Sequence, residues 1–139
     1  MNKVPVEDRL DIQEVVARYA FLCDTKQYER IGEVFADDAV FDESIIGMPV
    51  TRGKAAILAL FVAQGGAAEF MIHLNGNHLI SEYSESAASG TSHLHVEVLM
   101  KDGKQLHFYG YYADDYVKVA GRWLLKSRTL KAIGPVAFA

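Results

Sequence analysis

The spacing of hydrophobic residues changes once along this chain, near Phe70, and that change constrains the fold more than any other feature. Before Phe70, apolar residues recur at intervals of three and four, as on one face of an α-helix. After it, apolar and polar residues alternate, as in strands with one buried face. Helices followed by a run of strands predict an α+β fold, with N-terminal helices packed on a curved, mainly antiparallel sheet.

Three helical segments are expected before the change. The first begins near Asp8, the expected N-cap, and ends at Asp24. The second runs from Tyr28 to Phe35, and Asp37-Asp38 separates it from a short strand at 39–42. After a loop at 47–49, the third covers 54–64, and Gly65-Gly66 ends it.

Four strands are expected after the change, and tight turns join the later ones. Asp102-Gly103 is a strong hairpin signal because such turns need positive φ angles. A second turn is expected at 120–122. The predicted strands are 71–82, 87–100, 105–117 and 123–131. With no repeat or linker between them, the 139 residues form one predicted domain, 1–139.

Composition excludes several functions. The net charge of -4 and the lack of a Lys/Arg cluster argue against nucleic-acid binding. The lone cysteine, Cys23, rules out an internal disulfide and is typical of a reducing compartment. No apolar run approaches membrane-spanning length, and the first residues lack the apolar stretch of a signal peptide. We therefore expect a cytoplasmic protein without membrane contact.

Asp24 and His73 are the strongest candidates for chemistry. Asp24 ends an apolar helical pattern, where a carboxylate is unfavourable because the helix dipole is already negative there. Polar residues that oppose local preference are frequent at functional sites. If the fold brings His73 to this carboxylate, the pair is an oriented base able to take a proton from carbon.

A second polar pattern lies on the strand at 87–100. His93, His95 and Glu97 alternate with apolar residues and therefore share one face. Three ligands on one strand do not complete a metal shell, so we expect no metal, and a place at the pocket or a subunit contact instead. No Gly-rich phosphate loop or Gly-x-Ser-x-Gly motif is present. Cys23 is not read as a nucleophile, because the charge of the neighbouring Asp24 disfavours a thiolate.

The order of motifs resembles the SnoaL-like branch of the nuclear transport factor 2-like superfamily, whose fold is a cone-shaped α+β barrel. The resemblance covers nearly the whole chain. The motifs that carry it are Tyr19 and Asp24, 35–41 (FADDAVF), 52–57 (RGKAAI), 73–77 (HLNGN), 110–114 (GYYAD), Gly121-Arg122-Trp123 and Arg128.

Within that branch the site pattern resembles scytalone dehydratase, bile acid 7α-dehydratase and hexachlorocyclohexane dehydrochlorinase, which use a His–Asp pair. The resemblance implies that His73 is the catalytic base, that Asp24 orients it, and that Tyr19 and Arg128 assist by hydrogen bonding. It implies no cofactor. Ketosteroid isomerase shares the fold but uses a carboxylate base, for which the sequence shows no clear counterpart.

The aromatic and methionine side chains of the chain are mostly core by default, but some must line any cavity. They favour a small hydrophobic, ring-bearing ligand over a sugar phosphate. The expected substrate-binding residues are Phe41, Met48, Phe61, His95 and Tyr112.

Three functions remain open from the sequence: a dehydratase-like lyase or isomerase, a non-catalytic binding protein that uses the same pocket, and an assembly module. A homo-oligomer, trimer or dimer, is expected because helices can cover only one face of the sheet. The apolar tail, 132–139, is expected to pack over the pocket mouth or onto a neighbouring subunit. Sedimentation that showed a compact monomer at micromolar concentration would contradict the expected oligomer.

Overall fold

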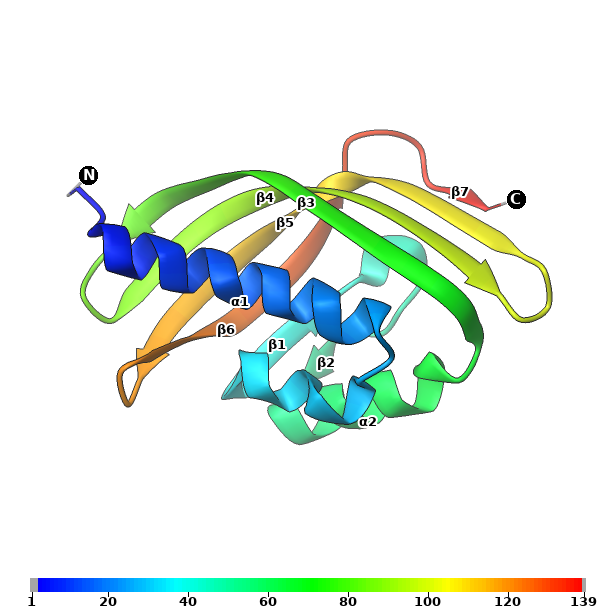
Figure 1. Ribbon diagram of the computed structural model, residues 1–139, viewed down its shortest axis with the longest axis horizontal. Coiled ribbons are helices and arrows are strands. Elements are labelled where there is room, and N and C mark those ends of the chain that lie inside the picture. Colours follow the sequence, from blue (N-terminus) through cyan, green and yellow to red (C-terminus); the bar gives the residue numbers. More distant parts are fainter. Residues whose placement is uncertain (1–2, 139) are drawn as a thin grey trace.

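The computed structural model describes residues 3–138, and its helices precede its long strands, as the sequence predicts (Figure 1). Its helical elements are α1 (Val6–Asp24), the 3-10 turns η1 (Tyr28–Val34) and η2 (Ser44–Ile46), and α2 (Lys54–Gly65). Its strands are β1 (Phe35–Asp42), β2 (Thr51–Arg52), β3 (Ala68–Tyr83), β4 (Ala87–Met100), β5 (Gln105–Val119), β6 (Arg122–Ala132) and β7 (Ala137–Phe138).

The strands form one curved sheet in the order β2-β1-β6-β5-β4-β3, with β7 added beside β5. Only β1 and β6 pair in parallel, so the sheet is mixed and mostly antiparallel. The α+β prediction is confirmed. The sheet is open, with β2 and β3 at its edges, so the cone is not a closed barrel.

The helices lie on the concave side of this sheet. In Figure 1, α1 runs beneath β3 and β4, while η1 and α2 lie together near β1 and β2. The buried face of α1 carries Ile12, Val16, Tyr19 and Cys23, at the spacing that the sequence pattern indicated. The hydrophobic core lies between this helix face and the inner side of the sheet.

Asp8 is not the N-cap of α1, because the helix begins earlier, with Pro5 at that position. The Asp8 side chain is buried and accepts hydrogen bonds from Trp123 Nε1 (3.0 Å), Lys118 Nζ (3.3 Å) and the Tyr83 hydroxyl. Its carboxylate therefore fastens the start of α1 to β3, β5 and β6. The N-cap prediction failed because these distant donors are invisible in local sequence.

The element boundaries differ from the prediction mainly around β1. The second helical segment is 3-10 and ends at Val34, and the strand begins at Phe35 rather than residue 39. Phe35 pairs with Leu125 of β6, and a register shift between Phe35 and Val40 accommodates the exposed Asp37-Asp38 pair. The pairing of β1 with β6 thus outweighs the local tendency of Asp37-Asp38 to interrupt a strand. The Asp102-Gly103 turn is present, with Gly103 at φ 91°.

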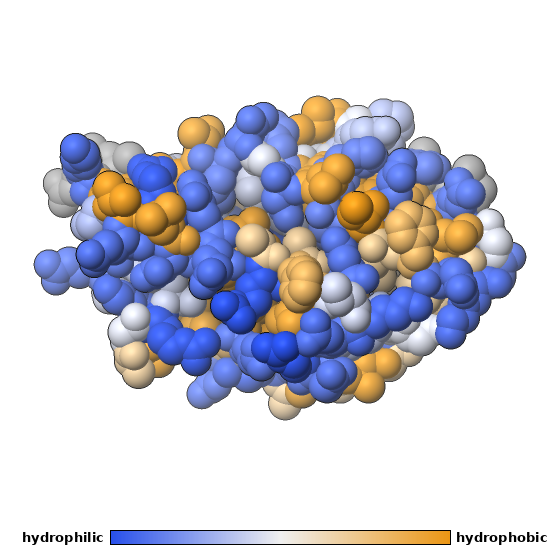
Figure 2. Space-filling model, viewed as in Figure 1, coloured by the Kyte–Doolittle hydropathy of each residue, from blue (hydrophilic) through white to orange (hydrophobic). Residues whose placement is uncertain are grey.

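Hydrophobic side chains remain on the surface along edge strand β3. Figure 2 shows such side chains over the course of this strand, and Phe70, Ile72 and Leu74 are among them. The tail pairs its backbone with β5, with Ala137 opposite His107. Exposed apolar groups on an unpaired edge are what a subunit contact would cover, and the homo-oligomer stays a prediction. Among residues 3–138, no helix is long and apolar enough to cross a membrane.

A buried ion pair joins β5 and β6. Arg128 and Asp114 are both fully buried side chains, and Arg128 Nε and Nη2 each donate to an Asp114 carboxylate oxygen at 2.9 Å. The Tyr116 hydroxyl also donates to Asp114 (3.0 Å), and His78 Nε2 lies 3.1 Å from that hydroxyl. Burial acts to lower the pKa of Arg128, but the charge and hydrogen bonds of Asp114 outweigh it and keep the guanidinium charged.

Removing Asp114 should therefore be far more harmful than removing its neighbour Asp115. Asp114→Ala leaves the Arg128 charge buried without a partner, and we expect a loss of about 3–5 kcal/mol of unfolding free energy. Asp115 is exposed and bonds only to the Ser89 and Ser127 hydroxyls, so Asp115→Ala should cost about 1 kcal/mol or less. Urea denaturation of both variants measures the difference. Equal losses would show that the buried pair is not a principal support of the fold.

Candidate active site

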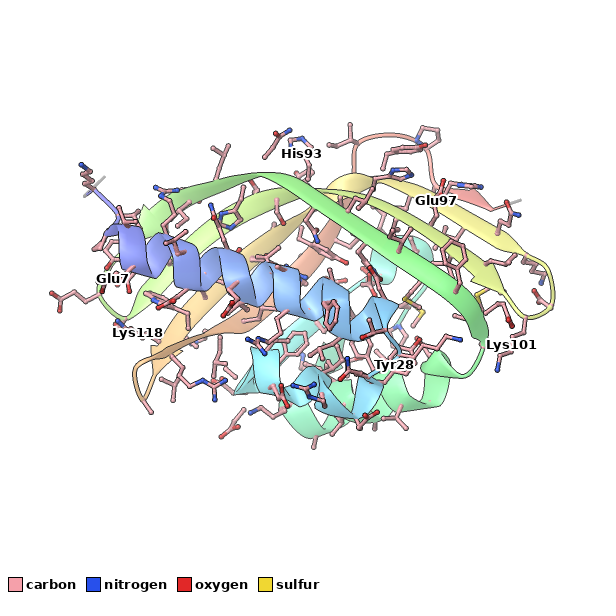
Figure 3. All side chains as sticks on the ribbon, viewed as in Figure 1. Glu7, Tyr28, His93, Glu97, Lys101 and Lys118 are labelled. Carbon is pink, nitrogen blue, oxygen red and sulfur yellow. The ribbon has the colours of Figure 1, made fainter. Side chains whose placement is uncertain are left out.

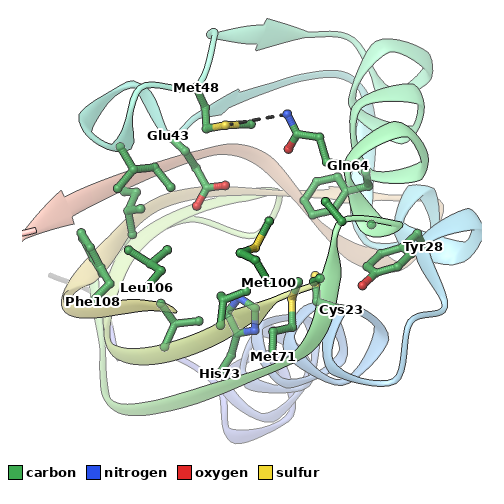
Figure 4. A pocket seen from close by; sticks show the side chains of 18 of the residues that line it. Cys23, Tyr28, Glu43, Met48, Gln64, Met71, His73, Met100, Leu106 and Phe108 are labelled. Atoms are coloured by element: carbon green, nitrogen blue, oxygen red, sulfur yellow. Dashed lines mark hydrogen bonds between the residues drawn. The ribbon is translucent and has the colours of Figure 1, made fainter. Parts of the chain in front are cut away.

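A cavity of about 700 Å³ opens between the concave face of the sheet, the end of α1 and α2 (Figure 4). Most of the side chains that surround it are apolar. They include Ile46, Met71, Leu94, Val96, Phe108 and Leu130. Its polar members are Tyr19, Tyr28, Glu43, Gln64, His73 and Tyr112, with Asp102, Lys104 and Gln105 at the β4–β5 hairpin. A mostly apolar pocket with a few convergent polar groups is typical of a site for a small organic molecule.

Asp24 and His73 meet at the wall of this cavity. His73 Nδ1 lies 2.6 Å from Asp24 Oδ1, and the His73 backbone N–H donates to Asp24 Oδ2 at 2.9 Å. The carboxylate accepts the Nδ1 proton, which leaves Nε2 of the neutral ring as a free base. The His73 side chain is only 9% exposed and Asp24 21%, so their interaction is shielded from solvent.

This contact explains a carboxylate at an unfavourable helix end. Asp24 is the last residue of α1, and β3 is an edge strand whose outer N–H groups have no neighbouring strand. Asp24 supplies the acceptor that the missing strand would have provided at His73. When His73 gains a proton, its charge lies beside both Asp24 and the negative end of the α1 dipole, which stabilise the cation.

Two tyrosines form the floor of the cavity next to His73. The Tyr19 ring packs edge-on against the rings of His73 (centroids 6.0 Å apart) and Tyr112 (5.9 Å). Burial raises the pKa of both phenols well above the ordinary value. Both hydroxyls therefore stay protonated at neutral pH and can donate hydrogen bonds to an oxygen of a bound molecule.

Arg128 does not reach the cavity, contrary to the sequence expectation. Its guanidinium carbon lies 3.8 Å from the Tyr112 ring centroid and 4.4 Å from that of Tyr19, and the side chain is fully buried. The two rings separate it from the cavity that they line. In this position Arg128 holds the two tyrosine rings in place and does not contact a ligand in the cavity. This position could not be predicted from local sequence, because burial depends on the packing of β5 and β6 against α1.

The expected ligand-contacting residues divide into three groups. Met48, Phe61 and Tyr112 line the cavity. Phe41 is buried behind it, where its ring packs against those of Phe35 and Phe61. His95 lies on the opposite side of the sheet, because its neighbours Leu94 and Val96 are the β4 residues that point inward. The assignments of Phe41 and His95 to the pocket were therefore wrong about position.

The His93, His95 and Glu97 stripe faces outward. Figure 3 shows His93 and Glu97 on the side of the sheet away from α1. His95 stacks on Tyr109 of β5 (centroids 4.6 Å apart), and Glu97 lies 3.3 Å from His107 Nδ1 and 3.6 Å from His95 Nε2. Among residues 3–138, no three His, Cys, Asp or Glu side chains are grouped as metal ligands.

Glu43 is the cavity residue that sequence reasoning missed. It follows β1, and its carboxyl group enters the cavity from the wall opposite His73 (Figure 4). Burial raises its pKa to about 7, while Arg128 opposes and Asp42 adds to the rise. Alternation along β1 was the available signal, since Ala39, Phe41 and Glu43 share a face.

The model of the SnoaL-like domain family matches residues 4–129 of this chain. The chain is a SnoaL-like domain. The match spans the elements that build the cavity, from α1 to β6. The family resemblance drawn from the motif order is therefore confirmed.

Similar proteins match this chain over most of their own length. The uncharacterised Mycobacterium tuberculosis protein Rv2910c is 26% identical over 92% of this SnoaL-like domain and 87% of its own length. A solved structure from Novosphingobium aromaticivorans, provisionally named an aromatic ring hydroxylase, is 28% identical, with a TM-score of 0.94 over 99% of this chain and 96% of that one.

A second structure from the same organism is provisionally named a scytalone dehydratase. It is 21% identical to the SnoaL-like domain, with a TM-score of 0.85 over 96% of this chain and 87% of that one. At that identity the similarity establishes the fold. The chemistry must be argued from the residues of this cavity.

The raised pKa of Glu43 predicts a specific dependence of stability on pH. Between its ordinary value of 4.5 and about 7, the folded state binds the Glu43 proton more tightly than the unfolded state. The free energy of unfolding therefore falls as the pH rises through this window. Glu43→Gln removes the titrating group, so the variant should gain stability relative to the wild type from pH 4.5 to 7, as measured by urea denaturation.

Glu33→Gln is the matched control for this measurement, because the Glu33 carboxyl group does not line the cavity. A hydrogen bond from Arg30 holds the pKa of Glu33 below its usual value, so this group is ionised across the window. We expect Glu33→Gln to keep the wild-type slope between pH 5 and 7. An unchanged slope in Glu43→Gln would mean that the Glu43 carboxyl titrates normally.

Proposed function

We propose that this SnoaL-like domain is a cofactor-independent, dehydratase-like lyase for a small hydrophobic, ring-bearing compound. The observation that carries the proposal is the His73–Asp24 pair at the wall of an apolar cavity. A base that is oriented, shielded and free at Nε2 is suited to removing a proton from a carbon next to a carbonyl group.

The proposed reaction begins when His73 Nε2 takes the proton. Asp24 keeps the ring in the correct tautomer and stabilises the imidazolium that forms. The electrons of the broken C–H bond move toward the carbonyl oxygen as an enolate. Tyr19 and Tyr112, whose phenols stay protonated, donate hydrogen bonds to that oxygen. Loss of a leaving group from the next carbon then forms the double bond.

The cavity supports the proposed class of substrate. Its wall is mainly aliphatic and aromatic, and among the described residues Lys104 is the one Lys or Arg side chain that lines it. Such a surface binds a ring system of low polarity and leaves a phosphate group without a partner. Lys104 and Asp102 lie only at the rim, on the β4–β5 hairpin.

Substitution of the two dyad residues should give unequal losses. His73→Ala removes the base, and we expect activity to fall by about 10²–10⁴-fold or more. Asp24→Asn keeps the base but loses the charge that stabilises the imidazolium, so a weak residual activity should remain. The measurement is exchange of the carbon-bound proton in deuterated water, followed by NMR on a panel of cyclic β-hydroxy ketones.

The same assay separates the alternatives. An enone product indicates elimination, whereas a shifted double bond or hydroxyl group indicates an isomerase. Arg9→Ala, a change at the far end of α1 from Asp24, should leave the exchange rate unchanged. Wild-type exchange in both dyad variants would contradict the proposal, and binding without any exchange by the wild type would favour a non-catalytic binding protein.

A further inference from the structure

The cavity contains a second group able to exchange protons, and it is not part of the His73–Asp24 pair. Glu43 lies in the turn between β1 and η2, and this turn is held by its own hydrogen bonds. Its carbonyl oxygen accepts from the backbone N–H of Ile46 (3.0 Å) and Met48 (3.4 Å), and Asp42 Oδ1 accepts from the Ser44 N–H (2.9 Å). The backbone is thus fixed while the side chain enters the cavity.

The surroundings of the Glu43 carboxyl favour its protonated form. No side chain among residues 3–138 makes a hydrogen bond to this carboxyl that would hold it as an anion. The groups that face it are Tyr19 and Cys23 from α1, Tyr112 from β5, and His73 across the cavity, with Arg128 behind the tyrosines and Asp42 beside it. Burial dominates these influences, and the pKa of Glu43 rises to about 7.

His73 and Glu43 therefore occupy opposite walls of one cavity, His73 with a nitrogen that can accept a proton and Glu43 with a proton that it can give. His73 carries a free base nitrogen, held in place by Asp24. Glu43 carries a proton for a large part of the time at neutral pH. A base and a proton-bearing acid that face one cavity can act as the two proton-transfer partners of one reaction.

We infer that Glu43 is the general acid that protonates the leaving oxygen, and that the substrate class is therefore an alcohol. This inference rests on the proposed lyase function and adds to it the residue that protonates the leaving oxygen. A hydroxyl group is a poor leaving group and departs as water when it receives a proton. A halide needs no proton, and a cavity built only for halide loss would have no use for an acid at this position.

The step balances without any further reactant. His73 Nε2 accepts the proton from the carbon beside the carbonyl, and the electron pair of that C–H bond becomes the new C=C bond. The C–O bond at the next carbon breaks as its oxygen takes the Glu43 proton, and water leaves. His73 is then an imidazolium and Glu43 a carboxylate. Net transfer of one proton from His73 to Glu43 through water restores both groups.

The opposite walls also define the geometry of elimination. Because the base and the acid approach from different sides, the proton and the hydroxyl group leave from opposite faces of the substrate (Figure 4). Tyr19 and Tyr112, on the cavity floor, remain available for the carbonyl oxygen. Each oxygen of a β-hydroxy ketone thus has its own donor.

The test compares leaving groups in one variant. Cyclic β-hydroxy ketones and their β-chloro counterparts are supplied to the wild type and to Glu43→Gln, with the non-enzymatic rates subtracted. We expect kcat/KM for loss of water to fall by about 10²-fold or more in Glu43→Gln, and that for loss of chloride to change by less than about 3-fold. Exchange of the carbon-bound proton with deuterium should persist, because His73 is intact.

Two further variants secure the interpretation. Glu43→Asp keeps an acid on a shorter side chain and should recover part of the loss of water. Glu33→Gln replaces a carboxylate that does not line the cavity, and should retain wild-type rates for both leaving groups. Thermal unfolding confirms that each variant is folded.

The outcomes separate this inference from the proposal beneath it. An equal loss for water and chloride in Glu43→Gln, or no loss for water, would overturn the role of Glu43 while the exchange reaction still supported His73 as the base. A wild type that exchanges no carbon-bound proton in any ketone of the panel would overturn the lyase proposal and this inference together.

Discussion

The charge of Arg128 is the constraint on which the cavity depends. This guanidinium is fully buried, and it is held by two hydrogen bonds from β6 to Asp114 of β5 and by the rings of Tyr19 and Tyr112. A buried charge is tolerated only with such partners. Because Tyr19 belongs to α1, the arrangement fixes the helix, both central strands and the two phenols of the cavity floor in one position.

The site uses the parts of the fold that regular secondary structure leaves unsatisfied. Asp24 stands at the negative end of a helix, and His73 lies on a strand with one unpaired edge. The two residues satisfy each other's hydrogen-bonding groups. The Asp24 carboxylate gains two donors, and the N–H at the strand edge gains an acceptor. The same contacts that close α1 onto β3 also orient the imidazole, so stability and function share these hydrogen bonds at this point.

Burial acts differently on each polar group around the cavity. It raises the pKa of Tyr19 and Tyr112 and keeps them as donors, and it raises that of Glu43 to about 7, where a carboxyl can lose or gain a proton. Asp24 is bonded to His73 and holds its ring in place. One apolar cavity therefore holds fixed donors, a base and an acid, which is the set that elimination of water from a hydroxy ketone requires.

Periodicity and turn signals in the sequence were enough to predict the α+β class, the long strands and their hairpin. The Asp24–His73 pairing was predicted from the resemblance in motif order and from a carboxylate set against its helix end. Which polar residues face the cavity followed from packing instead: Arg128 lies behind two rings, His95 lies outside, and Glu43 points inward. Those positions depend on sheet curvature and on helix packing across distant strands, which alternation along a single strand signals only in part.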